Sequence, residues 1–211
     1  MNTHIWDLAV RVFHWSLAVA FFISYLTGEE ESDLHIWAGY TVLGLISFRV
    51  LWGLIGTKYA RFSNFLYSPS ETIKYLKQLL KKEPKRYLGH NPAGGWMIIA
   101  LLVCLFVVTI SGLKVYAIEE GKGPLAGTGV EFSMIGSAHA SGYEEGHNES
   151  SEKEGHHDGD EKEEEFWEEV HEGASNFAIF LIFLHVLCVI ISSKLHKENL
   201  VKSMVTGDKK D

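Results

Sequence analysis

Cysteine is scarce in this 211-residue sequence: there are two, Cys104 and Cys188, and each lies in the middle of an apolar run. So few cysteines exclude a disulfide framework, and we interpret both as buried thiols. The N-terminal region also lacks the pattern of a cleavable signal peptide, because its first apolar run follows about eight residues and contains Arg11 and His14. We therefore expect this run to be retained as a membrane span.

Hydrophobic residues make up 46% of the sequence, and most of them lie in four long runs. Runs of about 17–25 apolar residues match the hydrocarbon thickness of a bilayer. We therefore predict a single domain over residues 1–211 with an all-α fold, an integral membrane four-helix bundle. The predicted spans cover residues 8–26, 34–55, 93–116 and 172–194.

Polar segments separate these spans. Residues 70–82 place leucine and isoleucine on one helical face and lysine elsewhere, which predicts an amphipathic helix at the membrane surface, with a soluble connecting helix as the alternative. Asn91 and Pro92 have the types expected of an N-cap and a first helical residue, so they predict the start of the third span. Residues 119–169 are rich in Gly, Ser, Glu and His, which predicts a disordered external loop. Residues 196–211 form a basic tail.

Basic residues are absent from the first connecting loop, residues 27–33, whereas residues 57–92 contain eight lysines and arginines. The C-terminal tail adds more lysines. Residues 119–172 contain three lysines against seventeen acidic residues. Because cytoplasmic loops carry the excess of lysine and arginine, we predict that both termini are cytoplasmic and that the acidic loop is external.

Histidines are absent from the third span but occur at matched depths in the other three. With the predicted topology, His14 and His185 lie toward the inner side of the membrane, and His35 and His171 lie toward the outer side. His171 and His185 are fourteen residues apart, which is about 21 Å along one face of an α-helix. Ionisable residues inside a span are costly and usually functional. Four histidines that form two pairs, each at one depth in the membrane, indicate two sites that each need two imidazoles.

Haem with both axial positions filled is the ligand that suits two facing imidazoles in a helical bundle. The sequence has no CxxCH motif, so the haem would be bound non-covalently. Two histidines leave no open position on the iron, which suits electron transfer. Arg11 and Arg49 are candidates to pair with the propionates of the inner haem, or to reach lipid phosphates instead. Small residues that leave room for a macrocycle are Ala18, Gly39, Gly112, Ala174 and Ala178.

Five fragments resemble the bacterial cytochrome b561 and nickel-hydrogenase cytochrome b family: RVFHW, LHIWAGY, YARFSNFLYSP, RYLGHNPAG and HKENLVKSMVTG. The resemblance implies a multi-pass, dihaem b-type cytochrome of the bacterial inner membrane. It also implies electron exchange between the membrane quinone pool and an external redox protein, such as a c-type cytochrome or a hydrogenase-like enzyme. The chain would act alone or as a homodimer. The ligand positions of the family correspond to His14, His35, His171 and His185.

A second function within the redox class is a quinone reductase of the same fold that oxidises superoxide or another small molecule. The sequence therefore leaves open an electron-transfer subunit or a quinone-linked oxidoreductase, and we assign no catalytic side chain. Tyr87, His90 and Asn91 lie near the expected position of a quinone headgroup, although helix capping and interfacial anchoring explain them as well.

A third possibility, a divalent-metal transporter, arises from the histidines of the acidic loop. It is disfavoured because the spans contain no carboxylate-rich ion site. The loop is also consistent with adventitious metal binding, or with docking of a basic c-type cytochrome, which opposite charge would attract. No nucleic-acid partner is expected.

Overall fold

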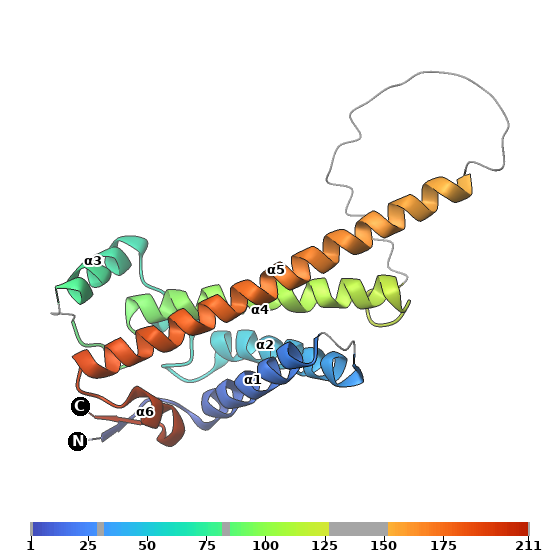
Figure 1. Cartoon of the computed structure of the whole chain (residues 1–211). Helices are drawn as coiled ribbons and strands as arrows, with labels where there is room; N and C mark the ends of the chain where they lie inside the picture. Colours follow the sequence, from blue (N-terminus) through green and yellow to red (C-terminus); the bar gives the residue numbers. More distant parts are fainter. Residues whose placement is uncertain (1, 29–31, 82–84, 127–151, 211) are drawn as a thin grey trace. The chain divides into compact units, whose positions relative to one another are not determined.

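The structure is a computed structural model that describes residues 2–28, 32–81, 85–126 and 152–210. Four helices of these residues are long and apolar enough to cross a membrane (Figure 1). They are α1 (Leu8–Leu26), α2 (Asp33–Ile55), α4 (Pro92–Glu119) and α5 (Glu152–Leu195), and the part of α5 suited to a span is Glu161–Leu195. The prediction of an all-α membrane protein with four spans is confirmed.

Local capping explains where the spans begin. The Asp7 carboxylate accepts a hydrogen bond from Val10 N at 2.8 Å before α1, and the Ser32 hydroxyl accepts one from His35 N at 3.4 Å before α2. The Asn91 side chain accepts one from Gly94 N at 2.7 Å, and α4 follows from Pro92. These caps satisfy amide groups that have no partner inside the helix. The predicted start of the third span is therefore correct.

The amphipathic helix of the second loop is α3 (Pro69–Leu80), close to the predicted residues. Its apolar residues Ile73, Leu76 and Leu80 are exposed, whereas Tyr75 is buried against the protein. A helix that turns leucine and isoleucine away from its own chain suits a lipid surface. Its place at the membrane surface stays a prediction.

The predicted disordered loop is wrong for residues 152–169. Helix α5 begins at Glu152, well before the expected residue 172, and α4 continues to Glu119. Glutamate and lysine are good helix formers, and a helix already formed by a span extends at low cost, one hydrogen bond per added residue. The remainder of the predicted loop, residues 127–151, lies outside the described residues.

The C-terminal tail, residues 196–211, contains secondary structure that the sequence did not predict. A short helix, α6 (Leu200–Thr206), leads into strand β2 (Asp208–Lys210), which pairs antiparallel with β1 (Asn2–His4) near the chain ends (Figure 1). Gly207 ends α6 with φ of 88°, a left-handed conformation that favours glycine. The two ends of the chain therefore hold each other. A single 3-10 turn, η2 (Phe62–Asn64), follows α2.

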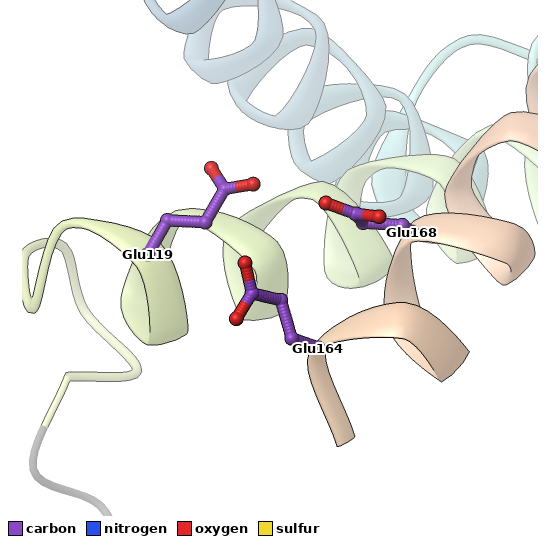
Figure 2. A group of neighbouring side chains, drawn as sticks. All are labelled: Glu119, Glu164 and Glu168. Atoms are coloured by element: carbon purple, nitrogen blue, oxygen red, sulfur yellow. The ribbon is translucent and has the colours of Figure 1, made fainter. Parts of the chain in front are cut away.

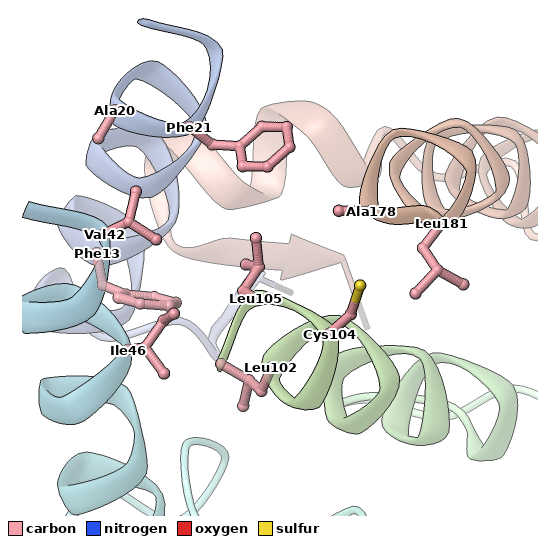
Figure 3. Packing of buried hydrophobic residues seen from close by; sticks show 10 residues of the cluster. All are labelled: Phe13, Ala20, Phe21, Val42, Ile46, Leu102, Cys104, Leu105, Ala178 and Leu181. Atoms are coloured by element: carbon pink, nitrogen blue, oxygen red, sulfur yellow. The ribbon is translucent and has the colours of Figure 1, made fainter. Parts of the chain in front are cut away.

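The chain divides into two compact units, Met1–Thr109 with Gly173–Asp211, and Ile110–Glu172. The interpretation of residues 1–211 as one domain stays a prediction. In the first unit, α1, α2, α4 and α5 share an apolar cluster (Figure 3). Its members are Phe13, Ala20, Phe21, Val42, Ile46, Leu102, Cys104, Leu105, Ala178 and Leu181.

The two alanines of α5 serve helix packing. Ala178 is fully buried in the apolar cluster, and the Cys104 thiol donates to the Ala174 carbonyl at 3.5 Å. Small side chains here let α4 approach α5, so the expectation that Ala178 faces a macrocycle is wrong. Cys104 and Cys188 are both free thiols, as the sequence indicates.

Candidate haem sites

Two of the four predicted ligand histidines face each other in the first unit. His14 comes from α1 and His185 from α5, and their ring centroids are 6.4 Å apart with an angle of 50° between the ring planes. Both rings are half-buried. The Nδ1 atom of His14 is buried and has no hydrogen-bond partner among the described residues. The structure therefore brings the rings of His14 and His185 together, and their role as ligands on the inner side stays a prediction.

This separation fits one metal ion between the rings. A bond from a metal ion to an imidazole nitrogen is about 2 Å long. Two imidazoles on opposite sides of one ion therefore have centroids about 6 Å apart, since each centroid lies about 1 Å beyond its nitrogen. Direct packing of two aromatic rings covers centroid distances of about 4.5–7 Å, so the separation of 6.4 Å fits either arrangement. The chemistry and the spacing of His14 and His185 both fit a haem with two axial histidines.

The two arginines predicted beside the inner haem differ in their surroundings. Arg11 donates from Nη1 to the Val205 carbonyl at 2.6 Å, which ties it to the C-terminal segment, and its Nε is buried without a partner among the described residues. Arg49 is 3% exposed and donates from Nη2 to the Ala60 carbonyl at 3.1 Å. Its guanidinium also lies over the Phe62 ring, 5.0 Å from the centroid. Because Arg49 is buried, reaching lipid phosphates does not explain it.

His35, a predicted ligand of the outer haem, is oriented by α1. Its Nδ1 donates to the Ser24 carbonyl at 2.8 Å. A ring with its hydrogen on Nδ1 carries its lone pair on Nε2, and a metal-ligating histidine typically makes such a hydrogen bond through its other nitrogen. Gly39, four residues later on α2, has no atom of the described residues within 4 Å of where a Cβ would lie. The surroundings of His35 therefore fit the predicted role.

His171, the other predicted outer ligand, is held by α4 within the second unit. Its Nδ1 lies 3.2 Å from the fully buried Ser111 hydroxyl, a hydrogen-bonding distance. A Cβ at Gly112 would come 2.8 Å from His171 Cε1. Gly112 therefore makes room for the His171 imidazole. The sequence had indicated only that Gly112 leaves room for a macrocycle. His35 and His171 belong to different units, and their pairing stays a prediction.

Three residues were candidates to contact a quinone headgroup, and two of them, Asn91 and Tyr87, make hydrogen bonds within the protein. Asn91 caps α4, and the Tyr87 hydroxyl donates to the Glu71 carboxylate at 3.4 Å. His90 is different, because its Nδ1 is buried without a partner among the described residues. The sequence gave no sign of this burial, since it depends on aromatic residues distant along the chain.

Three carboxylates, Glu119, Glu164 and Glu168, meet in the second unit, where one oxygen of each lies within 4.8 Å of the others (Figure 2). Glu119 and Glu168 are exposed, and Glu164 is half-buried. Nearby, Lys114 pairs with Glu163 at 3.5 Å. Partly exposed carboxylates commonly gather without a metal ion, so this group does not support a transporter.

The described residues thus combine four membrane-length helices with two histidines that face each other, an arrangement compatible with a helical membrane cytochrome. The chain belongs to the prokaryotic cytochrome b561 family, whose model matches residues 5–207. It is accordingly a b-type cytochrome: a multi-pass membrane protein that binds haem b and carries electrons across the membrane.

Two relatives illustrate the similarity. A "Probable Ni/Fe-hydrogenase B-type cytochrome subunit" of Rhodobacter capsulatus is 25% identical, and the alignment covers 98% of this chain and 80% of that protein. A protein of the same name from Azotobacter vinelandii is 27% identical over 57% of this chain and 61% of its own length. No solved structure matches the chain.

Proposed function

We propose that this protein passes single electrons through two non-covalent haem b groups, between the membrane quinone pool and an external redox protein. The observation that carries the proposal is the 6.4 Å separation of the His14 and His185 rings, which would allow both imidazoles to hold one haem iron. His35 and His171 are proposed as the ligands of the outer haem. Haem iron supplies the chemistry by alternating between the ferric and ferrous states.

The side chains of this protein hold and shield the two groups. The Ser24 carbonyl and the Ser111 hydroxyl orient His35 and His171 through Nδ1. Arg49 is proposed to balance the charge of a propionate of the inner haem, because its guanidinium is buried and Nη1 lacks a partner among the described residues. Arg11 is proposed for the same haem through its Nε.

The membrane setting of the proposal follows from charge. Lysine and arginine are concentrated in residues 57–92 and in the C-terminal tail, so we place both termini in the cytoplasm and the chain in the bacterial inner membrane. Quinone would then react near the inner haem, and the external partner would meet the outer haem.

A hydrogenase is our first candidate for that partner, because the relatives are named as hydrogenase cytochrome subunits. A basic c-type cytochrome is the second, because the described start of α5 exposes Glu161, Glu163 and Glu165. The dependence of the electron-exchange rate on ionic strength distinguishes these two partners. If a c-type cytochrome docks through these carboxylates, the rate should fall steeply as salt is added. A rate that salt does not change would leave the hydrogenase as the better candidate.

Haem counting on the purified protein tests the proposal. We expect two haem b per chain in the reduced-minus-oxidised absorption spectrum. The single variants His171→Ala and His185→Ala should each lose one haem and keep the other. His196→Ala is the matched control, since His196 follows α5 outside the proposed sites and should keep both. One haem per chain, or loss of the same haem in both single variants, would contradict the proposed pairing.

A further inference from the structure

His90, in the segment before α4, is a half-buried histidine with no role in the proposed electron path. Its ring lies between two aromatic rings, with centroids 4.5 Å from Trp6 and 4.6 Å from Phe65. Its Nδ1 is buried and has no hydrogen-bond partner among residues 2–28, 32–81, 85–126 and 152–210. A buried polar atom without a partner costs about 1–3 kcal/mol. A group from outside the chain is therefore the expected partner of this nitrogen.

Arg49 reaches the same aromatic ring. Its Cζ lies 5.9 Å from the Phe65 centroid, and its Nη1 is also buried without a partner in the described part of the chain. Its second terminal nitrogen donates to the Ala60 carbonyl, which is not charged. A buried cation is stable only when an anion or several acceptors compensate for its lost hydration. An anionic hydrogen-bond acceptor near Phe65 would therefore satisfy both His90 and Arg49.

The His90 ring is uncharged at neutral pH. Burial lowers its pKa to about 3, with smaller contributions in the same direction from Arg49, Lys209 and His185. A neutral imidazole carries one hydrogen, on one of its two nitrogens. With that hydrogen on Nδ1, His90 donates a hydrogen bond and adds no second positive charge beside Arg49.

The chain ends fix the orientation of this ring. Trp6 N donates to the Gly207 carbonyl at 3.1 Å, which holds the Trp6 backbone in place. Lys209 donates from Nζ to the Tyr87 carbonyl at 2.8 Å and pairs with Glu198 at 3.3 Å, and both of these charged side chains are 8% exposed. Gly207 and Lys209 of the C-terminal segment thus hold both Trp6 and the segment that leads to His90. The terminal sheet is part of the site rather than a separate appendage.

We propose that His90, through Nδ1, and Arg49, through Nη1, together bind one propionate of the inner haem. The proposal rests on the proposed function, in which His14 and His185 ligate that haem. A propionate is a carboxylate with acceptor oxygens only, so it satisfies both donors and neutralises Arg49. Arg49 lies over Phe62, which packs against the apolar cluster that contains Phe13 and Leu181. Phe13 is next to His14, and Leu181 is one helical turn before His185, so the donors lie at the end of the cluster that carries the inner pair.

The variant His90→Phe tests this assignment in the purified, haem-loaded protein. Phenylalanine keeps an aromatic ring between Trp6 and Phe65 but removes the donor. Both haems should remain, and the reduction potential of the inner haem should fall, because a less neutralised propionate disfavours the added electron. We expect up to about a tenfold change in the reduction equilibrium, which is about 59 mV for one electron. The propionate vibrations of this haem should shift in resonance Raman spectra.

Two further variants separate hydrogen bonding from packing. His90→Gln restores an N–H donor, so its potential should lie nearer to that of the unmodified protein. Leu80→Phe is the matched control, because Leu80 is 84% exposed on α3, outside the segments that hold His90 and Arg49. It should change neither potential.

Each other result overturns the assignment. Unchanged potential and propionate vibrations in His90→Phe would show that no propionate is bound there, and slower reaction with quinol at unchanged potentials would assign His90 to the quinone. Loss of the inner haem in both His90→Phe and His90→Gln would make His90 a ligand or a structural residue. Two other results would contradict the proposed function itself. They are fewer than two haems in the unmodified protein, or an inner haem that remains in His14→Ala.

Discussion

Alanine in place of Gly112 should weaken one haem site and spare the other. A Cβ at this position would lie 2.8 Å from His171 Cε1 and 3.1 Å from its Nδ1. Non-bonded carbon atoms pack best at about 3.5–4.0 Å, so the imidazole must move by roughly 1 Å. That movement strains the contact between Nδ1 and the Ser111 hydroxyl, which orients the ring.

The size of this effect follows from two opposing contributions. Overpacking of an ordered site costs about 1–3 kcal/mol. Alanine is a better helix former than glycine by roughly 0.5–1 kcal/mol, which offsets part of the cost. We expect a net loss of about 1–2 kcal/mol, or a fall in affinity for the outer haem by a factor of about 5–30.

Haem titration of the purified apoprotein measures both affinities, with His171→Ala serving to identify the absorption bands of the outer haem. The inner haem, ligated by His14 and His185, should bind as in the unmodified protein. Gly44→Ala is the matched control on α2, because its added Cβ meets no described atom within 4 Å. Equal weakening of both haems by Gly112→Ala, or unchanged affinity for both, would refute the reasoning.

Three further predictions concern the first unit. His14→Ala and His185→Ala should remove the same haem, and the double variant should lose no more; loss of different haems by spectroscopy would contradict the pair. Asp7→Ala should lower stability by about 1 kcal/mol, because Asp7 caps α1. Burial raises the pKa of Asp7, but hydrogen bonds from Thr57, Val10 and Trp52 outweigh it and the pKa is lowered. The stabilisation is therefore complete above the unfolded pKa of 3.8 and lost as pH falls through the lower folded pKa, so thermal unfolding of Asp7→Ala and the unmodified protein should converge in acid. Lys209→Met should lower the thermal unfolding temperature, since it leaves the buried Glu198 with one cationic partner fewer, whereas the exposed Lys202→Met should not.

The spans could be predicted from the sequence because their determinants are local. The apolar runs are long enough to cross a bilayer, and Asp7, Ser32 and Asn91 cap helices through residues only three positions away. The depth of each histidine then follows from its position in a span. This is why the sequence brought His14 together with His185 although they are far apart along the chain.

The start of α5 could not be predicted from composition. Residues 152–169 are as polar as a disordered segment, and composition does not register that a neighbouring span has already formed the helix. The error lies in treating the segment as isolated, since its residues need no buried core when they extend an existing helix.

The sequence alone determined the number of spans and the apolar runs that form them, because apolar run length is a local property. Only the tertiary structure decided how the inner end is built. Strand β2 pairs with β1 from the opposite end of the chain, and Trp6, Phe65 and His90 form their cluster from three separate segments. Strands of three residues are too short to show an alternating pattern, and whether Arg49 reaches lipid or is buried depends on the aromatic rings that the fold places over it.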